Sequence, residues 1–386
     1  MTACPQPDPL PGPGPGPGPS PGSEDLPATG WPPGTASGPG LRLDRPAELI
    51  AAVPVLLGFH PRDSLVLVSV TGPHLHDRLG LTVRVDLPRS SASARRVCRE
   101  AVGVLAGERP ARALALVVRD PGPAGPGPRR SRRDVGAAAR RELLDAGIEP
   151  IAALWATGTR AGDRWGCFDL PCTCGGLLPD AASTTLGVTA AVRDGRAVLP
   201  DRAAVLAPLD SDAGTRRRRA RLRDTGAAPA RVGAATGTAL LDACLDEAAA
   251  SRLVVDDGLA LALCGALDVG DVRDEALRRC LGPRAADAEQ LWAVLVAALP
   301  SPQRAHPLAL LAVCALLRGD GALATGATER ALAERPDHVL AGVVAASLHG
   351  TRDPRSPAAR WAGPGGLRRL LTAMLDPDAP DDTAAR

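Results

Sequence analysis

The chain has 386 residues and a formal net charge of +2, and all 45 basic residues are arginine because the sequence contains no lysine. This near-zero charge provides no global field that would attract nucleic acids or anionic membranes. The absence of lysine excludes the phosphate-binding P-loop and a Schiff base to pyridoxal phosphate. Aromatic residues are scarce, with two Phe and five Trp, which argues against base-stacking surfaces for RNA or single strands.

Cysteine usage and hydropathy indicate a cytoplasmic protein. The nine cysteines are odd in number, scattered and preceded by no signal peptide, which suits a reducing compartment better than a disulfide framework. The longest apolar run, residues 307–317, is shorter than the roughly 20 residues that a helix needs to cross a bilayer. We therefore expect no membrane partner.

The N-terminal segment differs in composition from the rest. Residues 1–40 contain 13 Pro and 9 Gly. Such a segment buries too little apolar surface to offset its chain entropy, so we predict a disordered tail. A ligand for a proline-binding groove is the alternative, although the composition alone favours a flexible tail.

The first foldable segment is predicted to form a helix followed by a β-hairpin. Asp44 can cap a helix that begins at Pro46, and Gly58 can end it in the left-handed conformation. Residues 65–70 (LVLVSV) have the continuous apolar pattern of a strand that is buried on both faces. Residues 81–87 (LTVRVDL) alternate between apolar and polar, as in a half-buried strand. Turn residues between the two runs favour antiparallel pairing.

Strands then alternate with helices, which indicates an α/β domain with a mixed sheet over residues 41–208. A Pro/Gly-rich loop that carries Arg129, Arg130, Arg132 and Arg133 is expected to be solvated. The further elements predicted in this domain are helices at 91–105, 134–146, 186–193 and 202–206, and strands at 113–118, 151–156 and 164–169.

These motifs resemble a known family. The run RPAELIAAVPVLLGFHPRDSLVLV…GLTVRVDLP is similar to the opening of the actinobacterial family called domain of unknown function four-one-nine-two. The similarity continues through RWGCFDLPCTC to LLRGDGALATGATERALAERPDHVLA and covers residues 41–349. The resemblance implies bacterial relatives, but it brings no activity and no assigned site residues.

The C-terminal half is predicted to be helical. Residues 209–231 are assigned to an arginine-rich linker. Residues 232–350 form an all-helical domain, because apolar residues recur at spacings of three and four. A Gly-Asp-Gly break at 319–321 indicates a helical hairpin that resembles one tetratricopeptide unit, which cannot form an array alone. Residues 351–386 are expected to be mostly flexible, apart from a short helix near 367–371.

Three groups of residues are candidates for a site. His60, Asp63 and Ser64 precede a strand and, with Arg84, Asp86 and Trp165, could line a polar cleft at the edge of the sheet. The structural alternative is that Asp63 or Ser64 bonds local backbone in a turn. The run Arg216, Arg217, Arg218 and Arg219 could bind phosphates of a nucleic acid, although a solvated linker is favoured.

The cysteines at 167, 172 and 174 form the third group. Thiolates at such short spacing can share a zinc ion, with a fourth ligand from Cys98 or a histidine. A glycine- and proline-rich turn that holds small polarizable side chains is the favoured alternative. We expect no cofactor on this basis, with zinc bound to Cys167, Cys172 and Cys174 as the competing hypothesis.

The sequence contains no complete catalytic motif, so it leaves open whether the protein is an enzyme. Our first hypothesis is a non-enzymatic cytoplasmic binding or adaptor protein with a protein partner. The second is an enzyme of unrecognised type with its site at the edge of the α/β sheet. The third is a zinc-stabilised protein that associates with nucleic acid through the arginine-rich linker.

Overall fold

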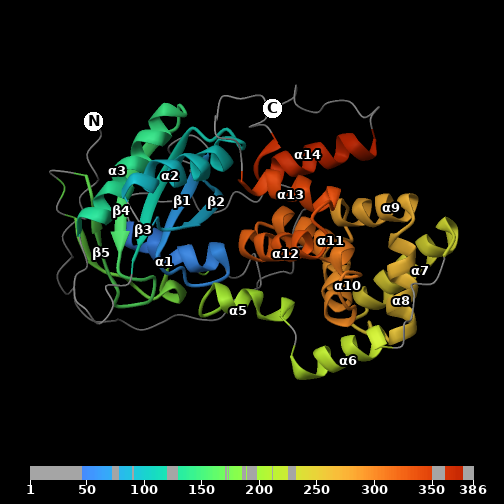
Figure 1. Cartoon of the computed structure of the whole chain (residues 1–386). Coiled ribbons are helices and arrows are strands. Elements are labelled where there is room, and N and C mark those ends of the chain that lie inside the picture. Colours follow the sequence, from blue (N-terminus) through green and yellow to red (C-terminus); the bar gives the residue numbers. More distant parts are fainter. Residues whose placement is uncertain are drawn as a thin grey trace, which may run out of the picture.

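A computed structural model describes residues 46–71, 78–88, 91–119, 129–169, 172, 174–184, 188, 198–210, 212–224, 232–349 and 361–376. The described chain divides into an α/β region and a helical region that lie side by side (Figure 1). Within the described residues, no helix is long and apolar enough to cross a membrane.

The α/β region is built on a six-stranded mixed sheet in the order β2-β1-β3-β4-β5-β6. Only β3 and β4 pair in parallel, and every other neighbouring pair is antiparallel. The two final strands therefore extend the sheet beyond its buried centre to an edge. The strands are β1 (Ser64–Thr71), β2 (Arg78–Asp86), β3 (Arg112–Val118), β4 (Glu149–Ala156), β5 (Arg164–Cys167) and β6 (Gly175–Leu177).

Helices cover both faces of the central strands (Figure 1). One face packs against α1 (Pro46–Leu57), whose Ile50 and Val53 are fully buried with Val66 and Leu116 of the strands. The other face packs against α2 (Ser91–Ala106) and α3 (Arg129–Asp145). Because both faces are covered, β1 and β3 carry continuous runs of buried residues, as expected for central strands.

The predicted α/β fold class is confirmed, and so is the hairpin of β1 and β2. Gly58 follows α1 with a φ of +76°, the left-handed conformation that glycine adopts without steric cost. Pro54 lies inside α1 without ending the helix. The tail at 1–40, the cap at Asp44 and most of the predicted helix at 186–193 lie outside the described residues.

The helical region has one continuous core. At its centre α11 is buried along almost its whole length, and Trp292 of α10 is fully buried beside it. Asp320 caps α12 by accepting a hydrogen bond from Leu323 N at 2.9 Å, which confirms the predicted break between two helices. The helices are α7 (Ala234–Ala249), α8 (Asp257–Leu267), α9 (Gly270–Leu281), α10 (Ala285–Ala298), α11 (Ala305–Leu317), α12 (Gly321–Glu334), α13 (Val339–His349) and α14 (Gly363–Leu375).

Contacts at α14 and α12 help to join the two regions. At the start of α14, Gly365 N donates to Glu108 Oε1, which follows α2, at 2.9 Å. The short helix α5 (Arg202–Leu206) packs against α12, where a side chain on Gly326 would collide with Leu206. The α/β and helical regions therefore share an interface formed by α2, α5, α12, α13 and α14.

Four local predictions need correction. Helix α3 begins at Arg129, where a loop was expected. Strand β6 was not predicted, because Gly175 and Gly176 have low strand propensity. Residues Ala213–Asp224 form helix α6 within the stretch assigned to a linker. Helix α14 is longer than expected and contributes Leu367 and Leu371 to the core, so this part of the C-terminal segment is ordered by packing.

Candidate metal centre at the edge of the sheet

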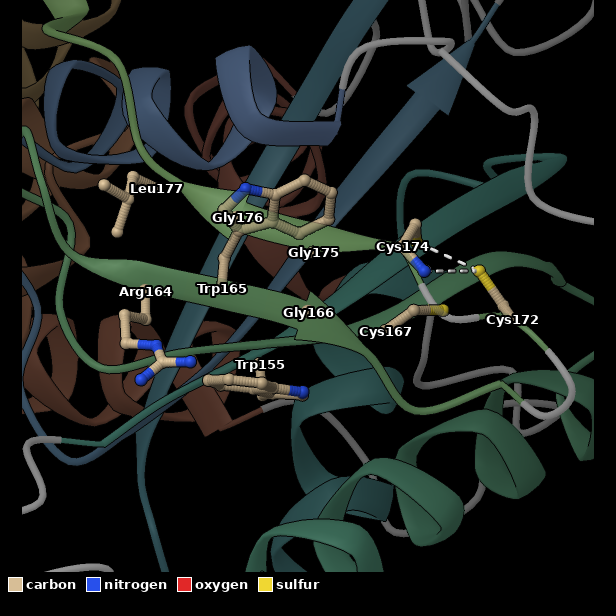
Figure 2. A pocket seen from close by; sticks show the side chains of 10 residues that line it. All are labelled: Trp155, Arg164, Trp165, Gly166, Cys167, Cys172, Cys174, Gly175, Gly176 and Leu177. Carbon is tan, nitrogen blue, oxygen red and sulfur yellow. Dashed lines mark hydrogen bonds between the residues drawn. The ribbon is translucent and has the colours of Figure 1, made fainter.

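Strands β5 and β6 bring three cysteines together. Cys167 ends β5, Cys174 immediately precedes β6, and Cys172 lies in the connection between them. The ladder continues past the two strands, since Cys167 N donates to Cys174 O at 3.2 Å. As a result, the three Sγ atoms lie within 4.8 Å of one another, and Figure 2 shows them at one end of the strand pair.

Backbone amides point at two of these sulfur atoms. Asp169 N donates to Cys167 Sγ at 3.4 Å, and Cys174 N donates to Cys172 Sγ at 3.4 Å. The two sulfurs also donate, Cys167 Sγ to Asp169 Oδ2 at 3.7 Å and Cys172 Sγ to Cys174 Sγ at 3.0 Å. The backbone therefore orients and solvates the donor atoms in the manner of an outer ligand shell.

Asp169 anchors the loop that carries the cysteines. Its Oδ1 accepts from Arg140 of α3 at 2.8 Å, and its Oδ2 accepts from Ala153 N of β4 at 3.2 Å. Its backbone carbonyl accepts from Cys172 N at 2.9 Å. This role of Asp169 was not predicted from the sequence, although an Asp between Cys167 and Cys172 is a residue that commonly turns the chain.

An open pocket of about 630 Å³ adjoins the cysteines along β5 and β6. Trp155 and Arg164 lie on one side of the strand and Trp165 on the other (Figure 2). The indole of Trp155 lies against Gly166, where an added Cβ would be 2.8 Å from the ring. Since Gly175 and Gly176 also lack side chains, the backbone itself forms much of the pocket wall.

The donor set suits a thiophilic ion such as Zn²⁺. Structural zinc sites take four ligands, whereas sites with three protein ligands keep one position open. Among the described residues, the three cysteines form the only cluster of potential metal ligands. Cys98, predicted as a possible fourth ligand, instead lies on the buried face of α2, in the core. Burial, together with the charge of Glu142, raises the pKa of its thiol to about 12.

Arg84 organises the polar edge of the sheet at β1 and β2. Its Nε donates to Ser64 Oγ at 2.7 Å, and its guanidinium lies 2.6 Å from Asp86. Ser64 Oγ in turn donates to Arg62 O at 2.6 Å. Burial lowers the pKa of Arg84, and the carboxylate of Asp86 opposes that effect. These contacts make Arg84, Ser64 and Asp86 one bonded group.

The other residues of the predicted polar cleft have different partners. His60 Nδ1 lies 3.0 Å from Thr159 Oγ1, and burial followed by the charge of Arg160 lowers the pKa of His60. Asp63 is 66% exposed and lies 3.8 Å from Arg119. Trp165 lines the pocket beside the cysteines. Of the six predicted residues, Ser64, Arg84 and Asp86 therefore lie together, whereas the other three contact different parts of the chain.

The arginine run lies on α6, and two of its members hold this helix in place. Arg218 donates to Asp257 at 2.6 Å and to Val255 O at 2.8 Å. Arg219 is buried and donates to two carbonyls at the end of α10, Val296 O at 2.5 Å and Ala297 O at 3.1 Å. A cation at a helix C-terminus satisfies exposed carbonyls and opposes the helix dipole.

A buried histidine pair in the helical region was also missed. His306 Nδ1 lies 2.9 Å from His338 Nε2, while Ala341 N donates to His338 Nδ1 at 3.2 Å. Arg335 Nη1 lies 2.9 Å from the other ring nitrogen of His306, Nε2. Burial, followed by the charges of His338 and Arg335, lowers the pKa of His306 to about 3, so this imidazole is neutral at pH 7.

The fold and the site together define a protein with an α/β sheet domain, an attached helical domain and a cluster of cysteines at the sheet edge. The profile of the family described as "Domain of unknown function (DUF4192)" matches residues 46–355, and the chain belongs to this family. No curated protein matches the chain, and no solved structure does either.

Proposed function

We propose that this protein binds a thiophilic divalent metal ion, with Zn²⁺ as the natural occupant, through Cys167, Cys172 and Cys174. The observation that carries the proposal is the convergence of three Sγ atoms within 4.8 Å. Thiolates at this density repel one another unless a cation lies between them. A bound ion would also fix the connection between β5 and β6.

The surroundings support an ion that is accessible rather than enclosed. The described residues supply three ligands, so the fourth position would be filled by water or by a ligand from the adjoining pocket. Asp169 contacts Cys167 Sγ through its backbone N–H and its carboxylate and so positions this sulfur. Neither the adaptor hypothesis nor the enzyme hypothesis gains a comparable cluster of groups from the described residues.

The test is the zinc content of the purified full-length chain. We expect one zinc per chain by mass spectrometry of the metal, with at least a tenfold loss of affinity in Cys167→Ser, Cys172→Ser and Cys174→Ser variants. Cys98→Ala is the matched control, because it removes a buried thiol that is not part of the cluster and should leave the stoichiometry unchanged. Equal zinc content in all four variants would refute the proposal.

A further inference from the structure

The sulfur atoms of Cys172 and Cys174 are 3.0 Å apart, closer than two non-bonded sulfurs ordinarily approach. We propose that this pair is an oxidisable dithiol, which a peroxide converts into a Cys172–Cys174 disulfide, and that this oxidation expels the metal ion. The dithiol stands on the geometry alone, whereas metal release rests on the proposed function.

The pair can close with little movement. A disulfide requires an S–S distance of about 2.05 Å, so the two sulfurs need to approach by only about 1 Å. Both residues lie at the end of the sheet, where β6 pairs with β5 on one side only. The residues that follow, Gly175 and Gly176, are exposed and present no side chain that must be repacked when the turn adjusts.

Access distinguishes the cysteines at the sheet edge from the other described cysteines. Like Cys167, Cys172 and Cys174 are partly exposed and line an open pocket, whereas the remaining described cysteines are buried. By contrast, burial raises the pKa of Cys98 to about 12 and that of Cys264 to about 11. Since the thiolate is the reactive species, a peroxide should spare the buried thiols.

The chemistry has two steps. The Cys172 thiolate attacks one oxygen of hydrogen peroxide, the O–O bond breaks, and a sulfenic acid forms. The hydroxide that leaves takes up the proton that Cys172 lost on ionisation and becomes water. The sulfur of Cys174 then attacks the sulfenic sulfur, the S–O bond breaks, and the hydroxide that leaves takes the Cys174 proton as water. In total, two thiols and one peroxide yield one disulfide and two waters, with the thiols oxidised and the peroxide reduced.

Cys167 remains a thiol in this scheme. It bonds to Cys174 through the backbone of the strand pair, with Cys167 N to Cys174 O at 3.2 Å, so a cross-strand disulfide is the competing product. If the 172–174 pair is bridged, a single thiolate is left for the ion. One thiolate cannot hold zinc against water and competing ligands, so the ion leaves.

The experiment treats the full-length chain with equimolar hydrogen peroxide, both after chelator treatment and after zinc loading. Remaining thiols are alkylated, and peptides are mapped by fragmentation. We expect a bridge between Cys172 and Cys174 with Cys167 alkylated, together with at least tenfold less oxidation of Cys98 and Cys264. A chromophoric chelator should record stoichiometric zinc release from the loaded protein.

Two variants keep the outcomes separate. Cys167→Ser should still form the bridge, although it binds zinc weakly, whereas Cys172→Ser should not. A bridge in a chain that binds no zinc would support the dithiol and refute the metal function. Zinc binding with no bridge, or with a bridge through Cys167, would overturn the inference and leave the metal function intact.

Discussion

Acidification should destabilise this protein through the buried histidine pair. In the folded chain the pKa of His306 is lowered to about 3, whereas in an unfolded chain it returns to about 6.5. The unfolded state therefore binds a proton first as the pH falls. Stability from this group is complete above about pH 6.5 and is lost progressively as the pH falls toward 3.

The size of the effect follows from the same values. At pH 5, which is one and a half units below the unfolded pKa, His306 should cost about 2 kcal/mol of unfolding free energy relative to pH 8. The side chain is only 11% exposed, so solvent screens little of this cost. His338, whose pKa is also lowered, mainly by burial, should add to it.

The assay is urea denaturation of the full-length chain at pH 8 and pH 5. His306→Asn keeps a polar side chain beside His338 but removes the titrating group, so this substitution should reduce the stability difference between the two pH values by about 2 kcal/mol. Exposed His349 provides the control, and His349→Asn should leave the difference unchanged. The same pH dependence in wild type and His306→Asn would refute the reasoning.

Three further changes test the packing. Glu108→Gln removes the negative charge that contacts the first turn of α14. It should lower the free energy of unfolding, measured by urea denaturation, by about 1 kcal/mol. An unchanged free energy would show that this contact does not stabilise α14. Arg219→Ala should lower the free energy of unfolding by about 1 to 3 kcal/mol, because backbone carbonyls at the end of α10 lose their donor. Arg217→Ala, at an exposed position of the same helix, should lower it by less than about 0.5 kcal/mol. Equal losses in the two variants would contradict the role of Arg219. Gly166→Ala should displace the indole of Trp155 and change tryptophan fluorescence, and an unchanged spectrum would count against the close contact.

The parts of the fold that the sequence predicted are those whose residues carry a periodic apolar pattern. The run LVLVSV predicted β1. Gly58 predicted the end of α1, because few residues other than glycine adopt its φ of +76°. The Gly-Asp-Gly break between α11 and α12 was equally clear. In these segments, local propensity and tertiary packing favour the same structure.

The missed elements depend on partners distant in the sequence. Strand β6 has glycines with low strand propensity and forms because β5 pairs with it. The sequence of helix α6 has the composition of a charged linker. The helix is held in place by the hydrogen bond from Arg219 to Val296 O at the end of α10, 77 residues away. The partners of α14 are likewise remote, since Glu108 and Gly365 are 257 residues apart.

The candidate site shows the same division. The spacing of Cys167, Cys172 and Cys174 was sufficient to nominate a metal site, but the sequence could not show that their sulfur atoms converge. That convergence depends on the pairing of β5 with β6 and on the anchoring of Asp169 by Arg140. Likewise, nothing in the spacing of His306 and His338 indicated that the two rings touch.

The measurement that tests the central claim most directly is zinc K-edge X-ray absorption of the zinc-loaded, full-length chain. If the three cysteines hold the ion, the spectrum should show three sulfur neighbours and one lighter ligand, and the sulfur contribution should fall in Cys167→Ser. A first shell of nitrogen and oxygen alone, or a spectrum that Cys167→Ser leaves unchanged, would contradict the assignment of the metal centre.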